Sequence, residues 1–103
     1  MTSPLSSRQW KRLNITTPAW GSLDLLAEQH SKAHDRVASV LIAIDEGVAI
    51  PSGVRRIPMT FAGVARRVYI VDGRWELFVA EAVSPGEDVL THIGDVNPAR
   101  LGR

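Results

Sequence analysis

Two turn signals lie between three strand-like runs in residues 63–95, and they constrain the fold more than any other feature of the chain. Asp72-Gly73 is a dipeptide that two-residue type I′ hairpins prefer, because both central residues of that turn need a positive φ angle. The Ser-Pro-Gly-Glu segment at 84–87 places proline where φ is already restricted and glycine where a type II turn needs a positive φ. The flanking runs are rich in Val, Ile, Tyr, Trp and Phe, which favour strands. The stretch therefore predicts a meander of three antiparallel strands.

A helical segment precedes the meander. Ser22 is a candidate N-cap, and apolar residues then recur at steps of three and four as far as Ile44, which marks a helix face turned toward a core. Gly47 follows as a natural residue to end the helix. The middle of the segment, residues 28–35, is almost wholly polar. The pattern therefore allows either one long helix or two antiparallel helices, with Ser31 capping the second.

The first part of the chain has a weaker pattern. Residues 1–8 are mostly small and polar and are expected to be disordered. Residues 9–16 predict a first strand, which Pro18 ends, and residues 47–62 predict an irregular connection. The fold expected for residues 1–103 is a single α+β domain, in which a helix or helical hairpin packs on a four-stranded, mostly antiparallel sheet.

Composition favours a cytoplasmic protein with no membrane association. The chain has no apolar run near the length of about 18 residues that a membrane-spanning helix needs, and its N-terminus lacks the apolar core of a signal peptide. It has no cysteine. Disulfide frameworks and thiol catalysis are thereby excluded, and a reducing compartment is the natural expectation.

Charge is distributed in blocks, although the formal net charge is only +1. Residues 1–21 and 47–75 are basic, and the segments that follow each of them are acidic. All the basic residues except Lys11 and Lys32 are arginines, and arginine favours bidentate contacts with phosphates and carboxylates. The basic blocks predict either a patch for nucleic acid or an acidic partner, or a mixed solvated surface.

The order of strand, helical segment and three-strand meander resembles the RelE/ParE toxin superfamily of type II toxin–antitoxin systems. The matching stretches are Arg66–Val71 (RRVYIV), Asp72–Phe78 (DGRWELF) and Val89–Gly94 (VLTHIG). The resemblance extends over residues 9–96 and implies a toxin that inhibits growth by binding or cleaving a nucleic-acid-processing target. It implies an antitoxin protein as partner. RNA and a topoisomerase both stay open as targets, and a homodimer stays open as the assembly.

Departures from the family pattern bear on which branch the chain resembles. RNA-cleaving members are usually strongly basic, whereas this chain is nearly neutral. Glu76 also stands where family strands often carry a basic residue. These departures favour a ParE-like, non-catalytic member, or a diverged one, over a ribosome-dependent nuclease, so whether the protein is an enzyme stays open.

Four residues are candidates for a catalytic site if the protein is nuclease-like: Arg66, Arg67, Arg74 and His92 would bind and polarise a phosphodiester. Arg66 and Arg67 are adjacent on a predicted strand, so their side chains point to opposite faces and one emerges on a largely apolar face. His92 is a candidate general base, because histidine side chains commonly exchange protons near neutral pH. The ordinary alternatives are arginines at the sheet margin or paired with Glu76, and a structural hydrogen bond for His92.

No metal and no cofactor are expected. His30 and His34 have the spacing of two helical metal ligands, but no third ligand lies near them in the sequence and a solvated polar face is the favoured interpretation. The glycines lack the lysine and spacing of a phosphate-binding loop. The alternative from another functional class is a non-catalytic protein-interaction module, such as a phage or bacterial adaptor.

Overall fold

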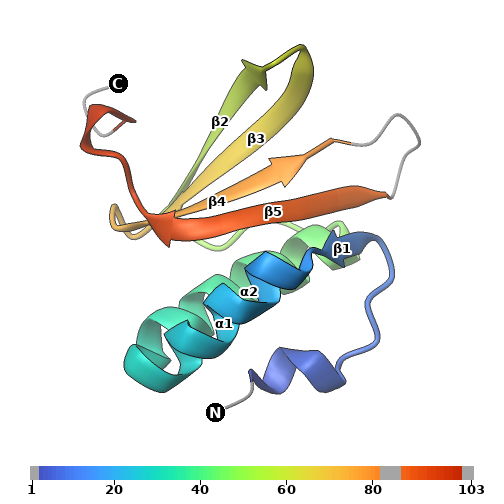
Figure 1. Cartoon of the computed structure of the whole chain (residues 1–103), viewed down its shortest axis with the longest axis vertical. Helices are drawn as coiled ribbons and strands as arrows, with labels where there is room; N and C mark the ends of the chain where they lie inside the picture. Colours follow the sequence, from blue (N-terminus) through green and yellow to red (C-terminus); the bar gives the residue numbers. More distant parts are fainter. Residues whose placement is uncertain (1–2, 82–86, 101–103) are drawn as a thin grey trace.

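The computed structural model describes residues 3–81 and 87–100, which form an α+β fold of two α-helices and a five-stranded sheet (Figure 1). The elements are a 3₁₀ turn at Pro4–Ser7, β1 (Leu13–Ile15), α1 (Thr17–Gln29), α2 (Ser31–Glu46), β2 (Val54–Phe61), β3 (Val64–Val71), β4 (Trp75–Ala80), β5 (Asp88–Asp95) and a 3₁₀ turn at Pro98–Arg100. The strand order is β1-β5-β4-β3-β2. Neighbouring strands are antiparallel except β1 and β5, which are parallel. The predicted α+β class is confirmed, and the predicted number of strands is wrong.

The additional strand is β2, which lies within the segment expected to be an irregular connection. It pairs with β3 along its whole length, from Val54 opposite Val71 to Phe61 opposite Val64. Pro58 interrupts the strand-like pattern of this segment. The structure tolerates it because β2 is an edge strand that needs hydrogen bonds on one side only.

The helical segment consists of two helices. His30 has φ −143° and ψ 70°, which is outside the helical region, and it separates α1 from α2. The two-helix alternative is therefore correct, although Ser31 is the first residue of α2 rather than its cap. At the other end of α2, Gly47 adopts φ 68°, which confirms the predicted helix end.

The start of α1 differs from the prediction. The helix begins at Thr17 instead of near Ser22, because the Thr16 side chain accepts a hydrogen bond from the Ala19 N–H. Pro18 lies in the first turn, where a missing N–H leaves no helical hydrogen bond unmade. Pro18 therefore lies at the start of α1, with Thr16 and Thr17 separating it from the end of β1.

The turn predictions have different outcomes. Asp72 and Gly73 have φ angles of 54° and 68°, so the predicted hairpin turn between β3 and β4 is confirmed. A second turn of the same kind, at Ala62-Gly63 with φ angles of 52° and 79°, joins β2 to β3. The predicted turn at 84–87 falls mainly on residues 84–86, which lie outside the described residues.

The sequence predicts disorder over residues 1–8. The structure instead gives residues 3–8 a defined conformation, so the expectation is wrong for them. Leu5 is only 7% exposed because it packs into the core. The Ser3 N–H donates to Asp24 on α1, and Arg8 pairs with Asp45 on α2. These contacts hold the segment across the helices, and the strand that follows is limited to Leu13–Ile15.

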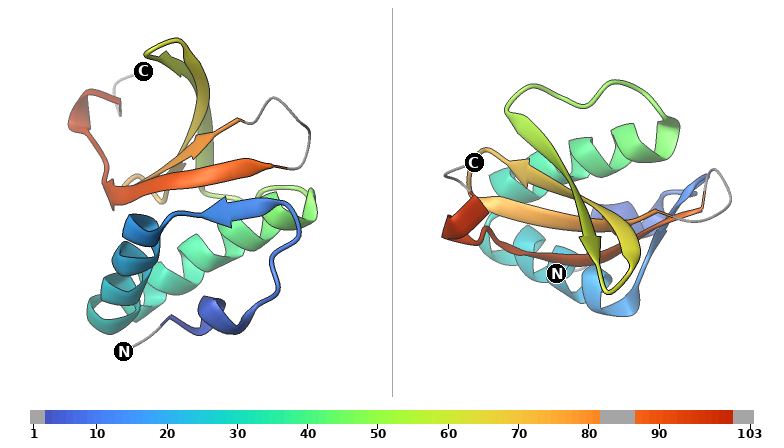
Figure 2. Two further views of the ribbon diagram at one scale, coloured as in Figure 1. Left: turned by 45° about the vertical axis from the view of Figure 1, so that its right-hand side comes forward. Right: turned by 90° about the horizontal axis from the view of Figure 1, so that it is seen from above.

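Both helices cover the same face of the sheet, which we call the inner face (Figure 2). The core lies between the two layers, with Leu23, Val37 and Leu41 from the helices meeting Tyr69, Leu77 and Leu90 from the strands. Alternation along β3 places Arg67 on the inner face with Tyr69. No helix in the described part of the chain is long and apolar enough to cross a membrane.

Candidate functional site

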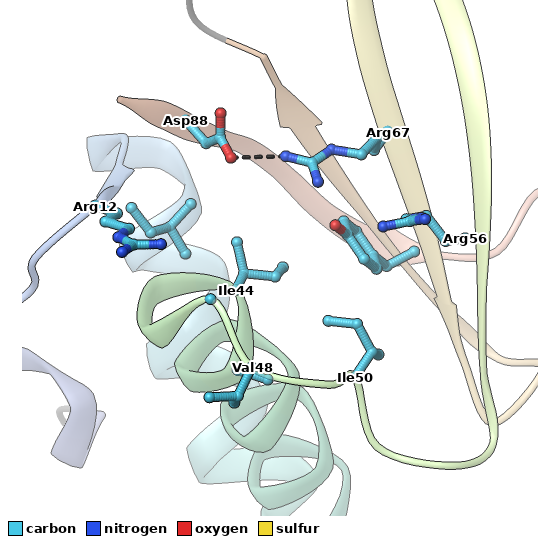
Figure 3. A pocket seen from close by; sticks show the side chains of 11 residues that line it. Arg12, Ile44, Val48, Ile50, Arg56, Arg67 and Asp88 are labelled. Carbon is cyan, nitrogen blue, oxygen red and sulfur yellow. Dashed lines mark hydrogen bonds and ion pairs between the residues drawn. The ribbon is translucent and has the colours of Figure 1, made fainter. Parts of the chain in front are cut away.

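A pocket of about 290 Å³ lies between the C-terminal end of α2 and the inner face of the sheet (Figure 3). Its polar lining is formed by Arg12, Arg56, Arg67, Tyr69 and Asp88. One further part of the lining is apolar and comes from Ile44, Val48 and Ile50. We call this site the arginine pocket.

The three arginines reach the pocket from separate parts of the chain. Arg12 directly precedes β1, Arg56 lies on β2 and Arg67 lies on β3. Figure 3 shows Arg12 on one side of the pocket and Arg56 and Arg67, from the sheet, on the other. Residues from the two basic blocks of the sequence therefore line the same pocket, and Asp88 is the one carboxylate among the described residues of its lining.

Arg67 is held by two carboxylates. Its Nη2 atom donates to Asp88 Oδ2 over 2.6 Å. Its Nε atom lies 3.0 Å from Glu81 Oε1, in an ion pair rather than a well-aligned hydrogen bond. The guanidinium carbon is also 5.9 Å from the centre of the Tyr69 ring. Arg67 is thus a fixed and largely neutralised part of the pocket wall.

Tyr69 contributes a buried hydroxyl. Arg56 and Arg67 lie near it, and the tyrosine as a whole is 1% exposed. Burial raises the pKa of Tyr69, and the nearby charges of Arg67 and Arg56 only partly offset that rise. The phenol therefore stays neutral at pH 7 and serves as a hydrogen-bonding group.

Arg12 is held through its backbone N–H, whereas its guanidinium makes no hydrogen bond to another described residue. The Arg12 N–H donates to Asp45 Oδ1 over 2.7 Å. The guanidinium lies against Gly47, where a Cβ atom, if one were present, would be 2.5 Å from Nη1. Within residues 3–81 and 87–100, no hydrogen bond or ion pair engages this guanidinium. Its charge is therefore available to an anion that enters the pocket.

The sequence-based candidates do not gather in one site. Only Arg67 lines the arginine pocket. Arg66 points to the opposite face of the sheet, where its Nη1 atom donates to Thr91 Oγ1 over 3.3 Å. His92 lies on that same face, in edge contact with Phe78 at a centroid distance of 5.2 Å.

Arg74 lies at another place again. Its guanidinium carbon is 4.8 Å from the centre of the Trp75 ring, beside the junction of the two helices. His30 contacts the same Trp75 ring at a centroid distance of 5.4 Å. Arg74 is therefore part of a stacked surface cluster.

The two spaced histidines have separate environments. His34 is 3% exposed, and its Nε2 atom is 2.7 Å from Ser3 Oγ. His30 instead contacts Trp75, so the two imidazoles do not share a ligand position. Across the part of the chain that the structure describes, no three His, Cys, Asp or Glu side chains gather closely enough to hold a metal ion.

Sequence reasoning missed Arg12, Arg56, Tyr69 and Asp88 as pocket residues. One signal pointed toward them, namely the concentration of arginine in residues 1–21 and 47–75. Arg56 was hidden because its segment lacks a regular strand pattern.

Comparisons with known proteins add no relative to this description. No protein-family model, no curated protein and no solved structure matches the chain significantly. The described residues form a small α+β fold with a pocket lined by three arginines.

Proposed function

We propose that the protein is a RelE/ParE-like toxin that inhibits growth by binding RNA at the arginine pocket without cleaving it. The order of elements supports the resemblance: a first strand, a helical hairpin and then consecutive antiparallel strands. The antitoxin of such a pair would cover the pocket with an extended or helical segment carrying acidic side chains.

The observation that carries the RNA proposal is the convergence of three guanidinium groups on one pocket. Guanidinium groups bind phosphate oxygens through charge-assisted, bidentate hydrogen bonds. Arg12 and Arg56 would contact the phosphate directly, and Arg67 would hold the opposite wall. Ile44, Val48 and Ile50 supply an apolar surface against which the adjoining sugar or base would pack.

Binding without cleavage is favoured because the described lining offers no suitable general base. Asp88 is engaged by Arg67. Tyr69 has a raised pKa and stays protonated at neutral pH. His92 lies on the opposite face of the sheet, away from the pocket.

The test combines growth with RNA affinity. We expect expression of the chain alone to arrest growth, and the purified protein to bind a fluorescent single-stranded RNA in anisotropy titrations. Arg56→Ala should weaken RNA binding about tenfold, which is the loss of roughly one charge-assisted contact. Arg74→Ala is the matched control, because it removes the same charge outside the pocket and should leave affinity unchanged.

Three results would overturn the proposal in different ways. RNA cleavage that survives further purification would show an enzyme. Growth arrest without RNA binding would indicate a protein target such as a topoisomerase. Neither arrest nor RNA binding would favour a protein-interaction module.

A further inference from the structure

The last turn of α2 carries two residues that act on Arg12. We infer that Asp45 and Gly47 together position the Arg12 side chain in the arginine pocket. Asp45 would fix the backbone of Arg12, and Gly47 would leave room for its guanidinium, so that Arg12 faces an incoming anion before binding. The consequence for ligand binding rests on the proposed function, whereas the positioning itself does not.

Asp45 fixes the backbone around Arg12. Its side chain is 0% exposed, and its Oδ1 atom accepts the N–H groups of Lys11, Arg12 and Leu13 over 2.9, 2.7 and 2.9 Å. Its Oδ2 atom accepts a hydrogen bond from Arg8 over 3.0 Å. A carboxylate held on both oxygens leaves the backbone of residues 11–13 little freedom, so the direction in which the Arg12 side chain departs is fixed.

Gly47 then provides the surface on which the guanidinium rests. Its φ of 68° ends α2, and its missing side chain leaves room for Arg12. A Cβ atom there would be 2.5 Å from Arg12 Nη1 and 3.5 Å from Arg12 Cζ. The guanidinium therefore occupies the space that any other residue at this position would fill.

An arginine also lies against Gly53, where a Cβ atom would be 2.9 Å from Arg36 Nη2, but none lies against Gly73. Gly73 has the same φ of 68° as Gly47, but a Cβ atom at this position would have nothing within 4 Å. Gly47 and Gly73 meet the same backbone requirement, and of these two only Gly47 also accommodates an arginine. Gly73 is therefore a matched control for the strain of an alanine at this φ angle.

Positioning matters because it lowers the cost of binding. A free arginine side chain loses rotamer freedom when it engages a ligand, and prior orientation removes part of that cost. Arg67 is already engaged by Asp88 and Glu81, whereas the Arg12 guanidinium lies in the space beside Gly47 that a side chain would fill. The backbone of Arg12 is fixed by Asp45, and no carboxylate of the described residues neutralises the guanidinium charge.

The experiment compares Gly47→Ala with Gly73→Ala in the full chain. The first readout is the ¹⁵Nε–H resonance of Arg12 in the free protein, assigned by its loss in Arg12→Ala. We expect Gly47→Ala to shift this resonance and Gly73→Ala to leave it in place. Thermal unfolding of both variants measures the strain of the added methyl group, which should be similar for the two.

The second readout is the affinity for inorganic phosphate and for a single-stranded RNA. Gly47→Ala and Arg12→Ala should each weaken binding about tenfold, the loss of roughly one charge-assisted contact. The double variant should be no weaker than Arg12→Ala, because both changes remove the same interaction. Gly73→Ala should bind like the wild type.

The outcomes separate the inference from the proposed function. An unchanged Arg12 resonance in Gly47→Ala, or binding equal to that of Gly73→Ala in a protein whose wild type binds, overturns the positioning role and leaves RNA binding intact. A wild type that binds neither phosphate nor RNA overturns the proposed function, and the resonance comparison still decides whether Gly47 positions Arg12.

Discussion

Replacing Asp45 by alanine should cost this protein a large share of its stability. The change removes the acceptor for three backbone N–H groups and the partner of Arg8. A buried donor left without an acceptor costs about 1–3 kcal/mol. The N–H of Leu13 is buried, whereas those of Lys11 and Arg12 are partly buried and can recover some hydration. We therefore expect a loss of about 3–5 kcal/mol, against a total of about 5–15 kcal/mol for a typical domain.

Urea unfolding at pH 7 measures this loss of stability. Two further variants separate the effect of the charge from that of the hydrogen-bond acceptor and from that of an exposed ion pair. Asp45→Asn keeps an oxygen acceptor but removes the charge, so it should cost about 1–2 kcal/mol. Asp72→Ala is the control, because it also breaks an arginine pair, with Arg36 at 2.9 Å, but on a side chain that is 46% exposed. Exposed pairs contribute about 1 kcal/mol or less.

The same carboxylate should make stability depend on acid. Burial raises the pKa of Asp45, but the N–H groups of Arg12 and Leu13, the Arg8 side chain and the N–H of Lys11 together outweigh burial and lower it overall. A group whose pKa is lowered on folding stabilises the protein fully above its unfolded pKa of about 3.9. That contribution disappears as the pH falls through the lower folded value.

The stability gap between wild type and Asp45→Asn should therefore be constant near neutral pH and shrink below about pH 4. An Asp45→Ala protein within about 1 kcal/mol of the wild type would refute the structural argument. A gap between wild type and Asp45→Asn that does not change with pH would refute the assigned pKa direction.

Three further predictions follow from the pocket and from the N-terminal segment. The logarithm of RNA affinity should fall with the logarithm of salt concentration with a slope of about −1.4, as two arginine–phosphate contacts to a single strand imply. Arg12→Ala should reduce that slope by about 0.7 in titrations at several salt concentrations. Arg66→Ala and His92→Ala should each leave RNA affinity within about threefold, because both lie on the opposite face and distant sites act independently; a larger loss would place the RNA on that face. Ser3→Ala should lower the free energy of unfolding by about 1–3 kcal/mol in urea titrations, since it leaves the buried His34 Nε2 atom without its hydroxyl partner; an unchanged midpoint would mean that the segment is not held by this contact.

Local signals in the sequence were sufficient for the elements whose conformation is set locally. Asp72-Gly73 fixes a hairpin turn through its own backbone preferences, and Gly47 ends a helix for the same reason. The polar stretch around His30 allowed a break between helices, which the structure contains. Each of these features depends on residues that are neighbours in the chain.

Features set by distant partners were not predictable in the same way. β2 carries Pro58 and the pair Arg55-Arg56, which obscure its alternation, and only its pairing with β3 makes it a strand. The arginine pocket joins Arg12 to Arg56 and Arg67 through the packing of both ends of the chain. Charge blocks indicated that arginine was concentrated, but they did not indicate which side chains would converge.

The parallel pairing of β1 with β5 has a consequence for how the protein is made. Leu13 lies opposite Asp88, so the first strand has no neighbour in the sheet until the last strand has been synthesised. Arg12 directly precedes this pairing, Asp88 is part of it, and both line the pocket. A nascent chain in which β5 has not yet been made therefore lacks a complete arginine pocket, and the pocket is completed only when β1 pairs with β5.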